Sequence, residues 1–163
     1  MRLLFTLLSL SVSHSSLSAS PSLETYKREM IKWEGVRFTP YADGKCFTSG
    51  IGHNLNAHRE TLKPRYSTLE VDRWFYKDLS LALDAANTGI RDFDDLPDEV
   101  QLLVIGLVWT VGPTGFKRFV NLRRALSWRA YEAAAMELLD SRWATQVSPA
   151  RAKHYRLILQ SQP

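Results

Sequence analysis

Residues Glu34 to Leu55 read EGVRFTPYADGKCFTSGIGHNL, and the type of fold depends on this stretch. Its β-branched and aromatic residues are interrupted by Pro40, Gly44, Gly50 and Gly52. That pattern favours short strands joined by tight turns. The stretch therefore predicts a short, glycine-rich hairpin or a three-stranded sheet.

Helical patterns flank this stretch on both sides. Leu23–Trp33 places its apolar residues at helical spacing, and Gly35 is suited to end that helix. Ser67 and Glu70 have the spacing of a capping box and predict the start of a long helix. Val100–Val111, VQLLVIGLVWTV, is apolar nearly all round and predicts a central buried helix. A strand is the alternative there, but 12 residues are long for a strand.

The C-terminal part also has helical patterns. A turn is predicted at residues 112–115, followed by helices over residues 116–126 and 130–139. Ser148 and Pro149 have the form of an N-cap and a first helical residue, and they predict a last, basic helix that runs to Leu159.

These elements predict an α+β fold that is mainly helical. We expect one domain over residues 21–163, with a small antiparallel sheet lobe at about 34–66. A linking helix at about 67–88 would join it to a helical lobe at about 95–160.

The composition excludes several classes of protein. Apolar residues make up 45% of the 163 residues and charged residues 23%, as is usual in globular proteins. The 5 Trp, 6 Tyr and 7 Phe argue against disorder, because such side chains need a core. Cys46 is the one cysteine, which excludes an intrachain disulfide and a cysteine zinc cluster. The net charge of +4 is scattered along the chain, so no nucleic-acid-binding arm is predicted.

The first 20 residues resemble a secretory leader. Arg2 precedes the apolar run Leu3–Val12, and small residues follow it, ending in Ser18-Ala19-Ser20. The run is too short for a conventional membrane-spanning helix, which needs roughly 20 residues. We expect a signal peptide, or alternatively an extension with an accidental apolar stretch.

Glu34, Asp43 and Thr48 lie within 15 residues and form the candidate catalytic group. The partial negative charge of a helix C-terminus and the neighbouring Trp33 favour a protonated Glu34 carboxyl, as a general acid requires. Asp43 lies in a polar turn beside Gly44, and the Thr48 hydroxyl could help to hold water. Such a group suits glycosidic hydrolysis. The residues taken singly also fit a surface glutamate, a turn aspartate and a strand threonine.

The segment from Glu34 to Leu55 resembles the catalytic segment of the phage-type lysozymes, glycoside hydrolase family 24, which include the T-even and lambdoid endolysins. In that family eight residues separate a Glu from an Asp, usually five separate the Asp from a Thr, and G-x-G-H follows. Here the first gap is eight residues and the second is four, so the turn after Asp43 is one residue shorter. Further similarity lies in WTVGPTG (109–115), AAAMELLDSRW (133–143) and PARA (149–152).

The resemblance implies a lysozyme-like, two-lobed fold and a role for each matching residue. Glu34 would be the general acid, and Asp43 with Thr48 would position and activate the attacking water. Arg151 would approach Glu34 from the helical lobe as its basic partner. Asn54 and Trp109 would line the cleft that binds the glycan, although a core aromatic explains Trp109 equally well.

His53 and Thr110 lie outside the candidate catalytic group. By the same resemblance His53 is structural, and we expect it in a surface ion pair with an acidic residue of the linking helix. Thr110 stands where an amide side chain is usual, and a hydroxyl offers fewer donors near Glu34.

The implied activity is that of a muramidase, which hydrolyses the β-1,4 bond between N-acetylmuramic acid and N-acetylglucosamine in bacterial peptidoglycan, with inversion. The resemblance implies no metal and no organic cofactor. We also expect a monomer with no nucleic-acid partner and no stable membrane insertion. The protein would be secreted, or released to the wall by a phage. The positive charge suits an acidic wall polymer.

Two other hypotheses remain open from the sequence. One is a non-catalytic peptidoglycan-binding protein on the same fold, supported by the shortened turn and by Thr110. The other is disruption of membranes by the basic C-terminal helix, although a helix that covers the core explains the same residues more simply.

Overall fold

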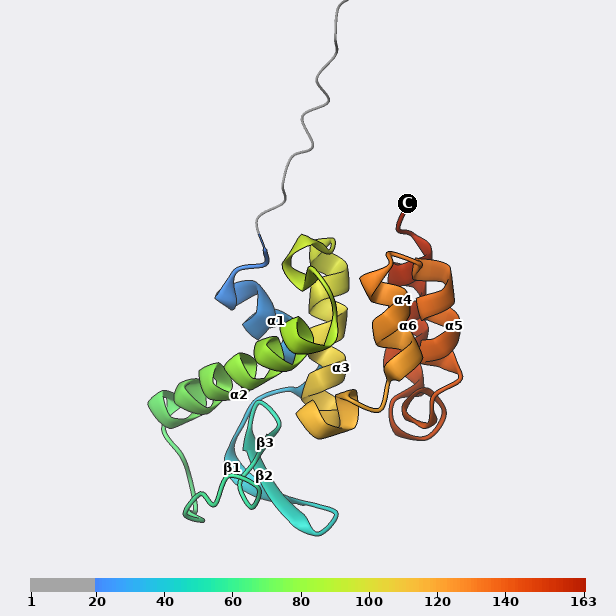
Figure 1. The fold of residues 1–163 in the computed structure, drawn as a ribbon. Helices are drawn as coiled ribbons and strands as arrows, with labels where there is room; N and C mark the ends of the chain where they lie inside the picture. Colours follow the sequence, from blue (N-terminus) through green and yellow to red (C-terminus); the bar gives the residue numbers. More distant parts are fainter. Residues whose placement is uncertain (1–19) are drawn as a thin grey trace, which may run out of the picture.

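The computed structural model describes residues 20–163, so the expected leader lies outside the described residues except for Ser20. Helices dominate this part of the chain, and a single small antiparallel sheet follows the first helix (Figure 1). The predicted α+β, mainly helical fold is therefore confirmed.

The sheet has three strands in the order β1 (Arg37–Asp43), β2 (Cys46–Gly50) and β3 (His53–Asn54). Asp43 pairs with Cys46, so β1 and β2 are joined by a two-residue turn. Gly44 in that turn has a φ of +59°, a conformation that glycine adopts easily. Of the two sequence predictions for this stretch, the three-stranded sheet is correct.

Helix α2 packs against the sheet and against α3, and α1 also packs against α3. Helix α1 ends where predicted, because Gly35 has a φ of +69° and its N–H donates to the Ile31 carbonyl. Helix α2 starts with the predicted capping box between Ser67 and Glu70. A 3₁₀ turn, η1, precedes α3. The bounds of these elements are α1 (Leu23–Glu34), α2 (Thr68–Gly89), η1 (Phe93–Asp95) and α3 (Asp98–Phe116).

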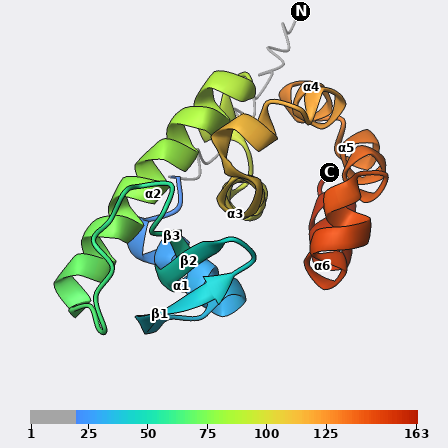
Figure 2. The same ribbon diagram turned by 90° about the horizontal axis from the view of Figure 1, so that it is seen from below.

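The remaining helices form a separate group that packs on α3 through α6 (Figures 1 and 2). They are α4 (Val120–Ser127), α5 (Tyr131–Leu139), a π-helical turn η2 (Trp143–Val147) and α6 (Pro149–Gln160). In both views α3 lies between this group and the part that contains α1, α2 and the sheet.

The predicted turn and helix after residue 111 need correction. Only Gly112 leaves the helical conformation, with a φ of +70°, and the chain then makes one more helical turn through Phe116. Pro113 suits that restart, because its fixed φ is helical and its missing N–H is not needed there. The next helix therefore begins at Val120. At α6, Pro149 occupies the first turn as predicted, but the Ser148 side chain makes no capping bond.

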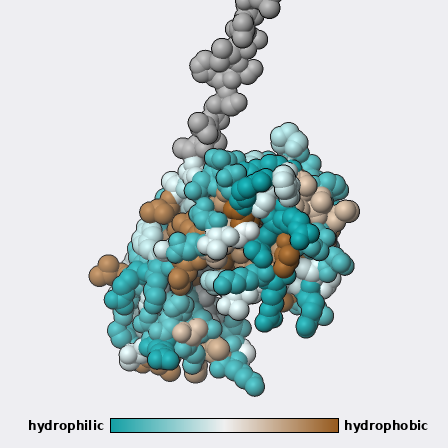
Figure 3. Space-filling model, in the orientation of Figure 1, coloured by the Kyte–Doolittle hydropathy of each residue, from teal (hydrophilic) through white to brown (hydrophobic). Residues whose placement is uncertain are grey.

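The core is built around α3. The side chains of Val100, Leu103 and Leu107 and their neighbours are almost fully buried, so the helix interpretation is correct and the strand alternative is wrong. By length and composition alone α3 could cross a membrane, but half of the relevant window is buried inside the protein. The face of the molecule in Figure 3 is mainly hydrophilic, with smaller apolar patches.

One glycine of α3 allows a polar side chain to reach the core. A Cβ atom at Gly106 would overlap the hydroxyl of Tyr155 on α6 and would lie 3.2 Å from Nη2 of Arg151. Burial raises the pKa of Tyr155 to about 12, so its hydroxyl stays neutral at ordinary pH. Gly106 therefore permits the close packing of α6 on α3.

We expect Gly106→Ala to lower the free energy of unfolding by about 1–3 kcal/mol, because overpacking outweighs the better helix propensity of alanine. Urea denaturation followed by circular dichroism measures this change. In a Tyr155→Phe background, which lacks the overlapping hydroxyl, the same alanine should have a much smaller effect. An equal loss in both backgrounds would contradict this explanation.

Candidate active site

The sheet brings three of the predicted site residues to one face. Thr48 of β2 pairs with Asn54 of β3 and, on its other side, with Tyr41 of β1. Asp43 lies two residues from Tyr41, so it projects from the same face, because side chains alternate along a strand. Asp43, Thr48 and Asn54 therefore share a face, as the strand register requires.

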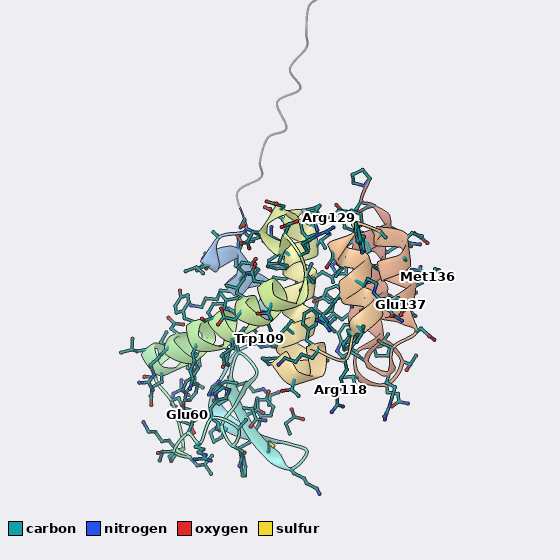
Figure 4. The ribbon with its side chains drawn as sticks, in the orientation of Figure 1. Glu60, Trp109, Arg118, Arg129, Met136 and Glu137 are labelled. Carbon is teal, nitrogen blue, oxygen red and sulfur yellow. The ribbon has the colours of Figure 1, made fainter. Side chains whose placement is uncertain are left out.

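That face forms one wall of a cavity of about 420 Å³. The sheet side contributes Asp43, Thr48 and Asn54. Helix α2 and the end of α3 form the opposite wall, and Trp109 lies on that side (Figure 4). The structure thus brings the predicted catalytic and substrate-binding residues of the sheet together with Trp109.

Glu34 does not line this cavity itself, but it lies beside Gly52, which does. A Cβ atom at Gly52 would be 3.5 Å from Oε2 of Glu34 and 3.2 Å from Nε1 of Trp109. Gly52 also has a φ of +73°, which favours glycine. The positive φ and the close approach of Trp109 at position 52 therefore favour glycine, and Oε2 of Glu34 lies beside this glycine.

The other oxygen of Glu34 is held by Arg151. Nη1 of Arg151 donates to Oε1 of Glu34 at 2.7 Å, and the guanidinium also lies over the ring of Trp33 at 5.0 Å. The Arg151 side chain is only 3% exposed, against 25% for Glu34. The sequence predicts an apolar setting for Glu34, whereas the structure places a cation against it. Arg151 approaches from α6, as the resemblance implies.

Tyr155 and Thr110 hold Arg151 in place. Nε of Arg151 donates to the Tyr155 hydroxyl at 2.8 Å, and Nη1 also donates to the Thr110 hydroxyl at 3.1 Å. Thr110 in turn donates to the Gly106 carbonyl at 2.9 Å. The hydroxyl at position 110 thus contacts the partner of Glu34.

Trp109 combines the two roles that the sequence left open. Its ring packs 5.5 Å from that of Phe75, as a core aromatic would. Its Nε1 donates to the Ile51 carbonyl at 3.0 Å, which ties α3 to the loop before Gly52. It also lines the cavity. Trp109 therefore belongs both to the core and to the wall of the site.

His53 makes the predicted ion pair with α2, but not at the surface. Its Nδ1 lies 2.6 Å from Oδ2 of Asp78, and the residue is 1% exposed. The ring also stacks on Trp74 at 4.7 Å, and that contact explains its burial. His58 lies beside the same carboxylate, but its ring is stacked on that of His53 with centroids 4.4 Å apart, so the three residues as placed do not fit a metal site.

A second cavity, of about 660 Å³, lies among the end of α3, α4, α5 and η2. It shares Thr110 and Val111 with the first cavity, so the two meet at the end of α3. We assign the site to the smaller one, because Asp43, Thr48 and Asn54 line it.

The sequence missed three residues that shape the site. Gly52 could have been found from its place in G-x-G-H, where it precedes His53. Tyr155 is four residues after Arg151 on a predicted helix, a spacing that brings side chains together. Nothing in the sequence marks Gly106 as important. A glycine is needed there because α6 packs closely on α3, and this packing cannot be read from the sequence.

No family model matches this chain. The chain is similar to "Peptidoglycan hydrolase gp36" of Pseudomonas phage phiKMV, with 26% identity over 133 residues. That match covers 80% of this chain but only 14% of the phage protein. It is also similar to "Probable T4-type lysozyme 2" of Dictyostelium discoideum, with 24% identity over 150 residues, which cover 77% of this chain and 88% of that protein.

We expect Glu34 and Arg151 to be energetically coupled by about 1–3 kcal/mol. The single variants Glu34→Gln and Arg151→Met and the double variant form the cycle, measured by urea denaturation. Arg151→Met leaves a half-buried carboxylate without its cation, so it should be less harmful when Glu34 is already neutral.

The more exposed pair Lys27–Asp72, with N–O distance 2.8 Å, is the matched control. Its cycle should give less than about 1 kcal/mol, as partly exposed pairs usually do. Equal coupling in both cycles would contradict a special role for the Glu34 pair in joining α1 to α6.

Proposed function

We propose that this protein is a muramidase that hydrolyses the β-1,4 bond between N-acetylmuramic acid and N-acetylglucosamine in bacterial peptidoglycan. The similarity to a protein named peptidoglycan hydrolase and to one named T4-type lysozyme supports the substrate class. The bond and the mechanism rest on the residues of the site.

The proposal rests on the positions of four side chains around one cavity. Asp43, Thr48 and Asn54 share a sheet face that lines a cavity, and Glu34 lies beside Gly52 at the edge of that cavity. Two carboxyls on different elements, with a hydroxyl beside one of them, are the groups that glycosidic hydrolysis needs.

Glu34 acts as the general acid in this proposal. Arg151 holds Oε1, whereas Oε2 lies beside Gly52, a residue that lines the cavity. Oε2 is therefore the oxygen that can give its proton to the glycosidic oxygen as the bond breaks. Arg151, in turn held by Tyr155, fixes the orientation of the carboxyl group.

Asp43 and Thr48 act on the water. The carboxylate accepts a proton from it, and the Thr48 hydroxyl helps to orient it toward the anomeric carbon. Attack from the face opposite the leaving group is a single displacement, and it inverts the configuration. Asn54 and Trp109 are positioned along the cavity to contact the sugars.

The setting in which the enzyme acts is part of the same proposal. We propose that residues 1–20 are a signal peptide and that the protein acts outside the cell, or on the wall after release by a phage, as a monomer. Removal of this segment takes away Arg2 alone among the charged residues, which leaves a net charge of +3 for binding an acidic wall polymer.

Glu34→Gln should lower the rate of bacterial wall clearing by a factor on the order of 10²–10⁴, because the amide has no proton to transfer. The fold should survive, since the amide oxygen still accepts from Arg151. Turbidity of a wall suspension measures the rate. Glu24→Gln, on the exposed first turn of the same helix, is the matched control and should clear at the wild-type rate. Wild-type protein that binds walls without clearing them would favour a non-catalytic binding protein.

The first sugar product from a peptidoglycan oligomer should be the α-anomer, because a single displacement inverts the β-linkage. Proton NMR during the first turnovers detects it before mutarotation. A β-anomer would indicate a covalent intermediate, and the roles given to Asp43 and Thr48 would then be wrong.

A further inference from the structure

One end of the cavity lies between β3 and α2. Asn54 ends β3, and Ala57 and His58 follow it in the loop. The loop meets the helix here, because Nε2 of His58 lies 3.4 Å from Oδ1 of Asp78 on α2. Leu81 and Ala82 lie one turn further along α2, on the same face of the helix, and they also line the cavity.

The side chain of Asn54 is held in one orientation by the backbone. Its Oδ1 accepts a hydrogen bond from the N–H of Ala57 at 2.9 Å, and its carbonyl accepts one from the N–H of His58 at 3.3 Å. An amide side chain has an oxygen on one side and an amino group on the other, and only the oxygen can accept from an N–H. The Ala57 contact therefore settles which side of the amide is Oδ1 and which is Nδ2.

The amino group of Asn54 is the part of this side chain that remains for a ligand. Nδ2 makes no hydrogen bond to any residue in the described range 20–163. Asn54 lines the cavity and pairs with Thr48, whose side chain lies on the same face of the sheet. Such paired residues have Cβ atoms about 4.5–5.5 Å apart. A polar group at this place in a cavity selects ligands that offer it an acceptor.

The surface next to Asn54 is apolar. Leu81 is 43% exposed although its side chain is large and hydrophobic, and the two alanines that line this end add only methyl groups. The carboxylate of Asp78 also lines this end, but its oxygens lie 2.6 Å and 3.4 Å from the nitrogens of the two neighbouring histidines. A ligand group that suits this end therefore has an acceptor and a small apolar part, and it carries no positive charge.

The acetamido group of an N-acetylated amino sugar has this composition. Its carbonyl oxygen can accept a hydrogen bond from Nδ2 of Asn54, and its methyl group suits the surface of Leu81. The amino group of a de-N-acetylated sugar is an ammonium at neutral pH and has donors only. It would meet Nδ2 donor to donor, and a site that leaves polar groups unpaired in this way discriminates strongly between ligands.

We propose that Nδ2 of Asn54 donates a hydrogen bond to the acetamido carbonyl of a bound amino sugar, whose methyl group packs on Leu81, and that this contact selects N-acetylated over de-N-acetylated glycan. Asn54 touches the sugar but transfers no proton, so it determines specificity. This role rests on the proposed muramidase function, because it needs the same glycan in the same cavity. Removal of acetyl groups from a wall protects that wall from this protein.

Asn54→Asp tests the contact, because it keeps the size of the side chain and an oxygen for the Ala57 N–H but replaces the amino group with a second oxygen. Clearing rates are compared for walls of one preparation, before and after chemical removal of the acetyl groups. The wild type should clear the acetylated walls about tenfold faster or more. Asn54→Asp should raise KM for acetylated walls and lower this ratio about tenfold. Asn54→Ala removes the donor without adding charge and should lower the ratio in the same direction.

Asn56→Asp is the matched control. The Asn56 side chain also accepts a backbone N–H, from Phe47, but the residue is exposed and is not among those that line the cavity. This variant adds the same charge two residues away, and its ratio should equal that of the wild type. The proposal is overturned if both Asn54 variants keep the wild-type ratio, or if Asn56→Asp lowers the ratio as much as Asn54→Asp does.

Calorimetry with the trimers of N-acetylglucosamine and of glucosamine measures the same preference without hydrolysis. The wild type should bind the acetylated trimer more tightly, and Asn54→Asp should lose that preference. A protein that clears no wall but still shows this Asn54-dependent binding would contradict the muramidase proposal and support the contact. A protein that clears walls but binds both trimers equally would contradict the contact alone.

Discussion

The contact between Glu34 and Arg151 joins two residues that are 117 positions apart in the chain, from the first helix and the last. A guanidinium that is 3% exposed must be paired, because an isolated buried charge is strongly unfavourable. Three groups accept hydrogen bonds from its Nε and Nη1, namely the Glu34 carboxylate and the hydroxyls of Thr110 and Tyr155, whereas Nη2 has no hydrogen-bond partner among the described residues. Since these three groups lie on α1, α3 and α6, the charge can be buried only when all three helices are in place.

The same requirement links the core to the site. Tyr155 reaches Arg151 only because position 106 is glycine, and the turn that brings the cavity wall against Glu34 has a positive φ at position 52, which glycine adopts easily. At position 106 a Cβ atom would block the Tyr155 hydroxyl, and at position 52 it would crowd Nε1 of Trp109. The orientation of the Glu34 carboxyl therefore depends on residues that never touch the cavity, such as Gly106.

Much of the fold follows from local patterns in the sequence, and what does not follow depends on distant contacts. The capping box of α2, the end of α1 at Gly35 and the helical character of α3 were predictable from spacing alone. Burial of His53 was not, because it results from stacking on Trp74 and pairing with Asp78, both on another element. The helical restart at Pro113 was missed for a related reason. Turn-forming residues indicate that a helix is interrupted, but they do not indicate how many residues leave the helical conformation.

The positions of the candidate site residues were predictable to the extent that they depend on strand register. The turn after Asp43 is one residue shorter than in the lysozymes that the sequence resembles, which raises the question of where Thr48 would then point.

In an antiparallel pair, the face of a side chain depends on which residues pair, not on how many residues lie in the turn. Asp43 pairs with Cys46, and Tyr41 pairs with Thr48. A shorter turn changes how closely the hairpin closes, but it leaves Asp43 and Thr48 on the same face. The positive φ of Gly44 allows two residues to make that turn. The missing residue therefore changes only the turn at the tip of the hairpin, and the side chains of Asp43 and Thr48 still line the cavity.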